Sequence, residues 1–172
     1  MAKFATLLEE ALEAWAYTRA GVIEEVENLS DEDLAYAPRP EARTAAELAR
    51  HIVESGLLMS GELSRADGDF RRKSYEALLR EHGRGAGLAS KRTKRELVAA
   101  LRRSHRDGEA ELRKAGELHM LQLIRRFDGV LGTRFAWMQH GISHEEYHRG
   151  QLALYARLLG RVPALTQRIL GE

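Results

Sequence analysis

The sequence predicts an all-α protein, a four-helix bundle that forms a single domain over residues 1–172, with short extra helices in its connections. Three observations favour this fold. The three prolines lie at positions 38, 40 and 163, so the long stretch between the last two contains none. Two Thr-x-x-Glu strings have the form of helix starts. Apolar residues recur at alternating steps of four and three, as on helices that pack in bundles.

The first helix is expected from about Phe4 to about Leu29, because an apolar stripe with this spacing covers that range. The stripe consists of Phe4, Leu8, Ala11, Trp15, Thr18, Val22, Val26 and Leu29. Residues 30–34 (SDEDL) then predict a capped short turn. Pro38 and Pro40 predict an extended connector, since a residue before proline is restricted to extended conformations.

Capping boxes mark the next two long helices. Thr44 and Thr93 are each followed three residues later by glutamate, so that hydroxyl and carboxylate can bond the free amides of a first helical turn. A second helix is therefore expected from Thr44 to about Ala66, and a third from Thr93 to about Lys114. Residues 67–92, which are rich in glycine and charge, connect them.

The remaining segments are less regular. The connector has room for one short helix at 74–82, and residues 115–132 predict either a helix end or extended chain closed by a turn at FDGVLG. No convincing alternating strand pattern is present. The last long helix is expected from Thr133 to Leu159, ended by Gly160 in the left-handed conformation that commonly stops helices.

Charge is divided unevenly along the chain. The net charge is +1, but residues 1–70 carry 6 basic and 15 acidic groups, residues 71–114 carry 14 and 6, and residues 115–172 carry 7 and 5. The basic middle segment indicates either a solvated face beside an acidic one or a patch for anions or nucleic acid. Because few aromatic residues lie in it to stack on bases, a nucleic-acid partner is not expected.

The composition excludes several classes of protein. There is no cysteine, which removes disulfides, cysteine-based zinc sites, iron–sulfur clusters and cysteine nucleophiles. No apolar run approaches 18 residues, so no membrane span is expected. The start MAKFATLLEEALEAW carries acidic residues and no signal-type apolar core, so a cytoplasmic location is expected. Seven histidines remain as candidate ligands and as groups that titrate near neutral pH.

Three of these histidines, His140, His144 and His148, are spaced four residues apart in the last helix. Two imidazoles at this spacing lie on one helix face and can bind one metal ion. His144 and His148 also lie on a stripe with Trp137 and Tyr155, which we expect to face the core. Because unsatisfied polar groups are costly there, the pair must form hydrogen bonds or bind a ligand.

Residues 144–148 (HEEYH) also match H-E-x-x-H, the peptidase motif in which the glutamate activates a water on zinc. No histidine follows the motif, and the positions where related peptidases need glycine and a third histidine hold Gln151 and Leu154. The peptidase interpretation therefore lacks a ligand. Glu145 is instead expected to pair with Arg149, four residues on, at the outer surface.

The third ligand is expected from upstream of the last helix. His51 is the best candidate, because it shares the predicted inward face of the second helix with Leu48 and Leu58. His82 and His105 lie in the charged middle segment and are expected to be exposed.

Two histidines leave alternatives open: His119 lies in an irregular segment, and His140, one turn before His144, is a rival ligand. With His51, His144 and His148 as ligands, a divalent ion has three protein nitrogens and one open position for water or substrate. That is the pattern of catalytic rather than structural sites.

Five further residues have structural interpretations. Gly150 is expected to let a neighbouring helix approach closely. Gln151 and Tyr155 either orient an imidazole or have local partners in the core. Trp15 and Trp137 are expected in the core.

Three stretches of the chain resemble the DinB-like superfamily of damage-inducible four-helix bundles. They are NLSDEDLAYAPRPEARTAAELARHI (28–52), HEEYHRGQL (144–152) and YARLLGRVP (155–163). The second contains H-x-x-x-H-R-G-Q, which resembles the family's most recognisable signature. The resemblance covers the chain nearly end to end, although residues 66–132 match little beyond helix placement.

The resemblance implies an up–down–down–up bundle, frequent homodimers, and a metal ion, commonly nickel or zinc, held by three histidines that map onto His51, His144 and His148. Some members are S-transferases or isomerases that use a low-molecular-weight thiol such as bacillithiol or mycothiol. We therefore expect a metal-dependent S-transferase or hydrolase with a small-molecule substrate. The alternative is a non-catalytic metal-binding bundle. Because the chain has no cysteine, any thiol must come from outside.

Overall fold

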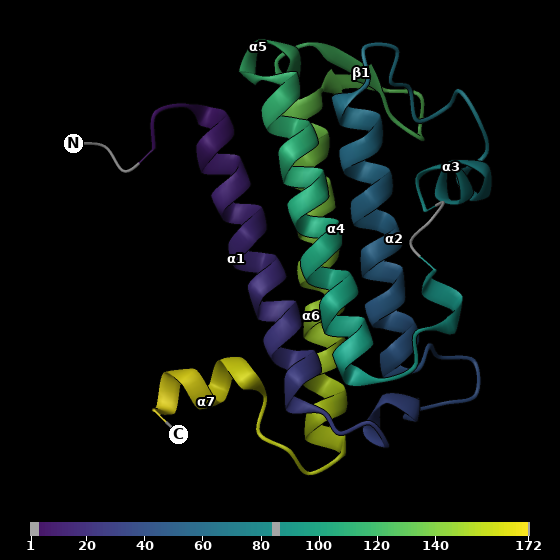
Figure 1. The fold of residues 1–172 in the computed structure, drawn as a ribbon, viewed down its shortest axis with the longest axis vertical. Coiled ribbons are helices and arrows are strands. Elements are labelled where there is room, and N and C mark those ends of the chain that lie inside the picture. The colour runs from purple at the N-terminus through teal and green to yellow at the C-terminus, as the bar shows by residue number, and fades with distance from the viewer. Residues whose placement is uncertain (1–3, 84–86, 172) are drawn as a thin grey trace.

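The computed structural model describes residues 4–83 and 87–171. Over this range it contains four long helices, α1 (Leu7–Asn28), α2 (Ala45–Ser64), α4 (Lys94–Ala115) and α6 (Arg134–Leu158). α1 and α6 run in one direction along the bundle, and α2 and α4 run in the other (Figure 1). The predicted all-α bundle and its up–down–down–up order are therefore confirmed.

Both predicted capping boxes form. Thr44 Oγ1 accepts a hydrogen bond from the Glu47 amide at 3.2 Å, and the Glu47 carboxylate accepts one from the Thr44 amide at 2.7 Å. Thr93 and Glu96 make the same exchange at the start of α4. These bonds satisfy amides that have no partner inside a helix, which explains why both helices begin where the sequence indicates.

The connection between α2 and α4 is long because the two helices are parallel. A 20-residue helix such as α2 spans about 30 Å, and the chain must return over that length before α4 begins. The return carries the predicted short helix, α3 (Tyr75–His82), and a 3₁₀ turn, η2 (Leu88–Ser90). The predicted turn after α1 is the 3₁₀ turn η1 (Asp33–Ala35).

Residues 115–132 contain a short helix and extended chain closed by a turn, so both alternatives expected there occur. A one-turn helix, α5 (Glu117–Met120), precedes β1 (Leu123–Arg125), and the pairing of β1 with β2 (Leu131–Thr133) in an antiparallel hairpin is the first of two features that were not predicted. Each strand has three residues, too few for an alternating pattern to stand out in the sequence. The second feature is the helix α7 (Ala164–Leu170), which has no buried residue among those described and hence no apolar stripe to predict it.

The core fills the space between the four long helices. The α1 stripe faces it as predicted, and Trp15, Val22 and Val26 are fully buried. Trp137 is only half-buried and packs against Phe70 at the hairpin end. Within the described ranges, no helix combines the length and the hydropathy needed to cross a membrane.

Gly141 lies where α6 packs against α2. A Cβ there would overlap with the Met59 side chain of α2, so the glycine leaves room for that side chain. A Cβ on Gly150 would meet no atom within 4 Å, and the residue is exposed. The prediction for Gly150 is therefore wrong, because that position of α6 faces solvent.

The acidic first third and the basic middle segment meet across α1 and α4. Arg102 pairs with Glu27 at 2.9 Å, and Arg113 pairs with Glu9. The Lys94 amide donates to Asp31 at 2.6 Å. The uneven charge along the sequence thus becomes complementary charge between neighbouring helices.

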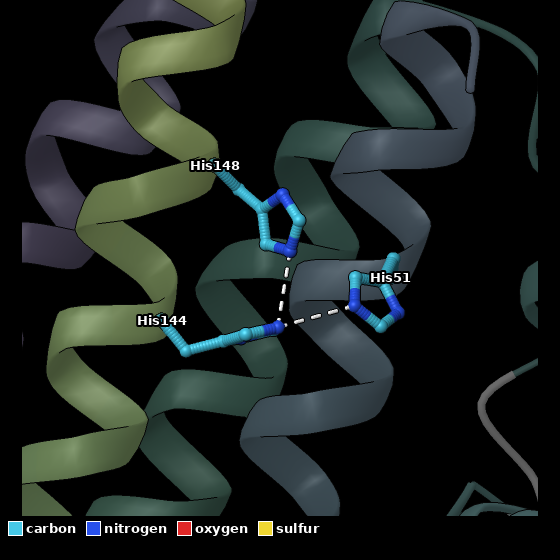
Figure 2. A group of neighbouring side chains, drawn as sticks. All are labelled: His51, His144 and His148. Atoms are coloured by element: carbon cyan, nitrogen blue, oxygen red, sulfur yellow. Dashed lines mark hydrogen bonds between the residues drawn. The ribbon is translucent and has the colours of Figure 1, made fainter. Parts of the chain in front are cut away.

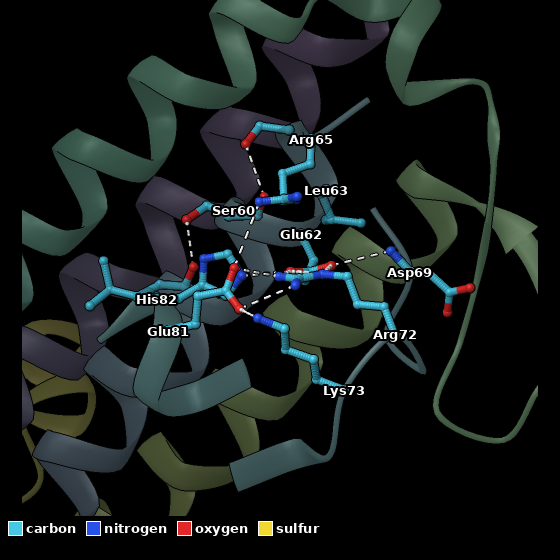
Figure 3. A network of polar contacts seen from close by, with 12 residues as sticks. Ser60, Glu62, Leu63, Arg65, Asp69, Arg72, Lys73, Glu81 and His82 are labelled. Carbon is cyan, nitrogen blue, oxygen red and sulfur yellow. Dashed lines mark hydrogen bonds and ion pairs between the residues drawn. The ribbon is translucent and has the colours of Figure 1, made fainter. Parts of the chain in front are cut away.

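A buried ion-pair network attaches the α2–α3 connection to the bundle (Figure 3). The fully buried Glu62 carboxylate accepts hydrogen bonds from Arg72, from His82 Nε2 at 2.6 Å and from the Asp69 amide at 3.2 Å. Burial alone raises the pKa of Glu62, but the hydrogen bonds outweigh it and lower the pKa to about 2. The prediction that His82 is exposed is therefore wrong, because its side chain is hydrogen-bonded to the buried Glu62 carboxylate. Arg72 extends the network to Glu81 at 2.9 Å.

Candidate metal centre

Three histidine side chains from two helices converge in the bundle (Figure 2). His144 Nε2 lies 3.0 Å from His148 Nε2 and 3.3 Å from His51 Nε2. All three ligand atoms lie within 4.8 Å of one another. In the described part of the chain, no other group of three His, Asp or Glu side chains converges in this way.

The local structure explains why these imidazoles meet. His144 and His148 are one turn apart on α6, so their rings project from the same face. His51 lies on the face of α2 that packs against α6. Gly141 leaves room for the Met59 side chain where those two helices pack.

The spacing of the nitrogens suits a metal ion. Ligand nitrogens about 2.05 Å from a tetrahedral ion lie about 3.3 Å from one another, close to the two Nε2 separations here. Among the described residues, the three Nε2 atoms have no partner except each other. Three nitrogen lone pairs therefore converge, and no charged or accepting group of the protein meets them. Such an arrangement suits a divalent cation.

The imidazoles are held in the neutral form that binds metals. Burial is the largest cause that lowers the pKa of His51, and the Arg43 charge adds to it, so that this pKa is about 4. Burial also lowers the pKa values of His144 and His148. His148 is 4% exposed, whereas His51 and His144 are half-buried and border the surface.

Gln151 orients one of the rings. Its Oε1 lies 2.7 Å from His148 Nδ1. An amide oxygen only accepts, so Nδ1 carries the proton and Nε2 presents its lone pair to the cluster. Tyr155 instead donates its hydroxyl to the Arg43 carbonyl at 3.0 Å. Of the two interpretations offered for this pair, Gln151 therefore orients an imidazole and Tyr155 has a local partner.

Replacing Gln151 by leucine is expected to weaken metal binding about 10- to 100-fold, because His148 loses the acceptor that fixes its tautomer and ring orientation. A competitive titration against a chromophoric chelator measures the affinity. Gln139→Leu, an exposed glutamine on the same helix, is the matched control and should leave the affinity unchanged. Equal affinities for the two variants would show that Gln151 does not orient His148.

The structure corrects the prediction for Glu145. The residue is 1% exposed, and its Oε1 accepts from Trp15 Nε1 at 2.9 Å. Arg19 Nε donates to Oε2 at 2.9 Å, and Arg19 Nη2 donates to Oε1 at 2.5 Å. Glu145 faces α1 because α6 packs on that helix, and Arg149 pairs with Glu146 instead, at 3.2 Å. With both carboxylate oxygens engaged, Glu145 is not placed to act as the base of a peptidase.

The remaining histidines lie outside the cluster. His140 is exposed and its ring contacts Trp137, so it does not displace a member of the group. His119 Nε2 donates to the Leu63 carbonyl at 2.9 Å. The prediction that His105 is exposed is wrong. Its side chain is only 12% exposed, because its ring packs against Trp15 with the two ring centroids 4.5 Å apart.

A cavity of about 520 Å³ borders the cluster at His51. Its other walls come from the connector before α2, from further residues of α2 and from α3, and they include Arg43 and Tyr75. Sequence reasoning missed these residues, because no periodic pattern relates a connector to a short helix about 30 positions away. The sequence contains one indirect signal for Arg43. The prolines at 38 and 40 and the capping residue Thr44 place residue 43 directly before the N-terminus of α2.

Several solved structures are similar to this chain. A DinB-like protein (YjoA) from Bacillus subtilis is 21% identical with a TM-score of 0.65, over 89% of this chain and 93% of that one. A DinB-like protein from Bacillus cereus is 19% identical with a TM-score of 0.66, over 90% and 94%. YfiT from Bacillus subtilis is 14% identical with a TM-score of 0.66, over 94% and 93%. Its description reads "a probable metal-dependent hydrolase with an unusual four-helix bundle topology".

At these identities the likeness shows a shared fold. No curated protein matches the chain. The sequence pattern of the DinB superfamily matches residues 14–152, which include His51, His144 and His148. Because the match extends from α1 to the end of the histidine motif, the chain belongs to the DinB superfamily.

Proposed function

We propose that the protein is a divalent-metal-dependent enzyme whose ligands are His51, His144 and His148. The observation that carries this proposal is the convergence of three neutral imidazole nitrogens beside an open cavity. The description of YfiT as a probable metal-dependent hydrolase supports it, since that protein has the same fold. Nitrogen-only ligands favour zinc or nickel over magnesium or calcium, which prefer oxygen.

The residues of the site have separate roles. The three imidazoles hold the ion, and Gln151 fixes the tautomer of His148. The cavity that borders His51 is the side from which we propose that a small molecule approaches the remaining coordination position. Zinc or nickel bound there supplies a Lewis acid that lowers the pKa of water or of a thiol at that position. The reactions proposed are therefore hydrolysis and S-transfer from an exogenous low-molecular-weight thiol.

Metal removal is expected to slow conjugation of a small thiol to a chromogenic electrophile such as 1-chloro-2,4-dinitrobenzene. A free thiol of pKa about 8.5 is only about 3% ionised at pH 7, so full ionisation at the site raises the rate on the order of 30-fold. The assay compares zinc- or nickel-loaded protein with chelated protein, and ester hydrolysis is measured in parallel. Readdition of the ion should restore the rate.

The same assay separates this proposal from the non-catalytic alternative. If the protein binds one ion per chain and both rates are unchanged after chelation, it is a metal-binding bundle without turnover. If no ion binds, the histidines have a structural role.

A further inference from the structure

Another cavity, of about 570 Å³, lies between α2 and α4, which run side by side (Figure 1). Its volume falls within the range of about 300–1,000 Å³ that is usual for small-molecule sites. On α2 it is lined by Val53 and Leu57, which lie about 200° and 240° around the helix from His51. The cavity is therefore on the side of α2 that faces away from the histidine cluster.

The cavity is hollow because α4 contributes short side chains to its wall. Ala99 and Ala100 line it together with Val53 and Leu57 of α2, and Leu88 of η2 adds a further apolar side chain. Larger residues at the two alanine positions would fill the space between the helices. Ala99 is exposed and Leu57 is only partly buried, so apolar surface is left for the body of a ligand to cover.

Three cations border this apolar surface, namely Lys91, Arg95 and Arg103. In the part of the chain that the structure describes, none of their side chains makes an ion pair or a hydrogen bond. The imidazole of His82 also reaches the wall, but its Nε2 is already hydrogen-bonded to Glu62 at 2.6 Å. The three cations are therefore the groups of this cavity that are free to bind a charged ligand.

The two carboxylates of the wall do not favour a cationic ligand. The Glu96 carboxylate belongs to the capping box of α4, where it accepts the Thr93 amide at 3.0 Å and the Arg92 amide at 3.1 Å. Asp107 lies eleven positions further along α4, about 16 Å away along the helix axis, so the two carboxylates cannot bind one cation together. The charges that remain select an anion.

We propose that this cavity binds an amphiphilic anion, a molecule with an alkyl or aromatic body and a carboxylate or sulfonate head. The body lies against Ala99 and Leu57, and Lys91 and Arg95 bind the head through charge-assisted hydrogen bonds. The head is assigned to that end of the cavity because Asp107, one helical turn beyond Arg103, repels an anion at the other end. The site is separate from the histidine cluster and needs no metal.

The test compares two fluorescent probes that share one aromatic skeleton. 1-Anilinonaphthalene-8-sulfonate is N-phenyl-1-naphthylamine with a sulfonate added, and both emit strongly only in apolar surroundings. The sulfonate is expected to bind the folded protein at one site per chain, about 10- to 100-fold more tightly than the neutral probe. Decanoate should displace it, because its chain and carboxylate occupy the same places. Failure of decanoate to compete overturns the proposal.

Two variants test the head and the body separately. Arg95→Ala is expected to weaken sulfonate binding about 10-fold and to leave the neutral probe unaffected, which a general loosening of the fold would not do. Ala99→Trp fills the cavity from an exposed position and should abolish binding of both probes. Circular dichroism establishes that both variants fold.

Arg106→Ala is the matched control, an exposed arginine of α4 that does not line the cavity, and it should bind both probes as the wild type does. The same holds for His148→Ala, because the site is independent of the metal. Equal affinity for the charged and neutral probes overturns the inference, as does sulfonate binding that survives in Ala99→Trp. Neither result affects the proposed metal centre.

Discussion

Replacing His148 by alanine is expected to abolish stoichiometric metal binding. His148 is the most buried of the three candidate ligands, and its Nε2 lies 3.0 Å from that of His144. Two nitrogens from different helices would remain, so the affinity should fall by more than the roughly 100-fold that loss of an orienting partner can cause. Elemental analysis of the purified proteins should show about one ion per wild-type chain and almost none in the variant.

The control for this experiment lies about two helical turns away. His140→Ala removes an exposed imidazole of the same helix that lies outside the cluster, so this variant should keep its metal. Circular dichroism establishes that both variants fold. Metal that is retained in folded His148→Ala, or lost in His140→Ala, would contradict the ligand set. His51→Ala and His144→Ala should behave like the His148 variant.

Replacing Glu145 by alanine is expected to destabilise the metal-free protein by about 3–5 kcal/mol, because the change leaves the Arg19 guanidinium buried without its counter-charge. Arg19 and Glu145 are 2% and 1% exposed, so water cannot replace the lost partner. Trp15 also loses its hydrogen-bond acceptor. For a chain of this length the melting temperature should fall on the order of 10 °C, measured by thermal unfolding followed by circular dichroism.

Glu27→Ala is the control for this variant. It removes a carboxylate of α1 that is 47% exposed and pairs with Arg102, which is itself 54% exposed, so it should cost about 1 kcal/mol or less. Adding Arg19→Met to Glu145→Ala should recover part of the loss, since the unpaired charge is the main cost. A Glu145→Ala variant as stable as Glu27→Ala would show that the buried pair does not stabilise the fold.

Much of the fold is predictable because it depends on local signals. The capping boxes at Thr44 and Thr93 act within one helical turn, and the α1 stripe needs only the period of the helix. The histidine cluster is predictable for a similar reason. His144 and His148 share a face by spacing alone, and the inward face of α2 points to His51.

The features that sequence reasoning missed depend on contacts between distant segments. The sequence around Glu145 is typical of the outer face of a helix. Only the contact of Glu145 with Arg19, 126 positions away, makes it a core residue. Arg43 lies near His51 because the connector before α2 and α3 line the same cavity as that histidine. The hairpin is too short to show a period, and α7 has no buried face among its described residues.

His51 and His144 are separated by 93 positions, more than half of the chain. An ion shared by them would be a reversible cross-link between two helices that are not consecutive, in a protein that has no disulfides. Unfolding disperses the ligands, so binding and folding are coupled. Each tenfold rise in free metal above the dissociation constant then adds about 1.4 kcal/mol to the stability. The lifetime of the folded protein would therefore depend on the free metal concentration around it, and the metal-free form would unfold first.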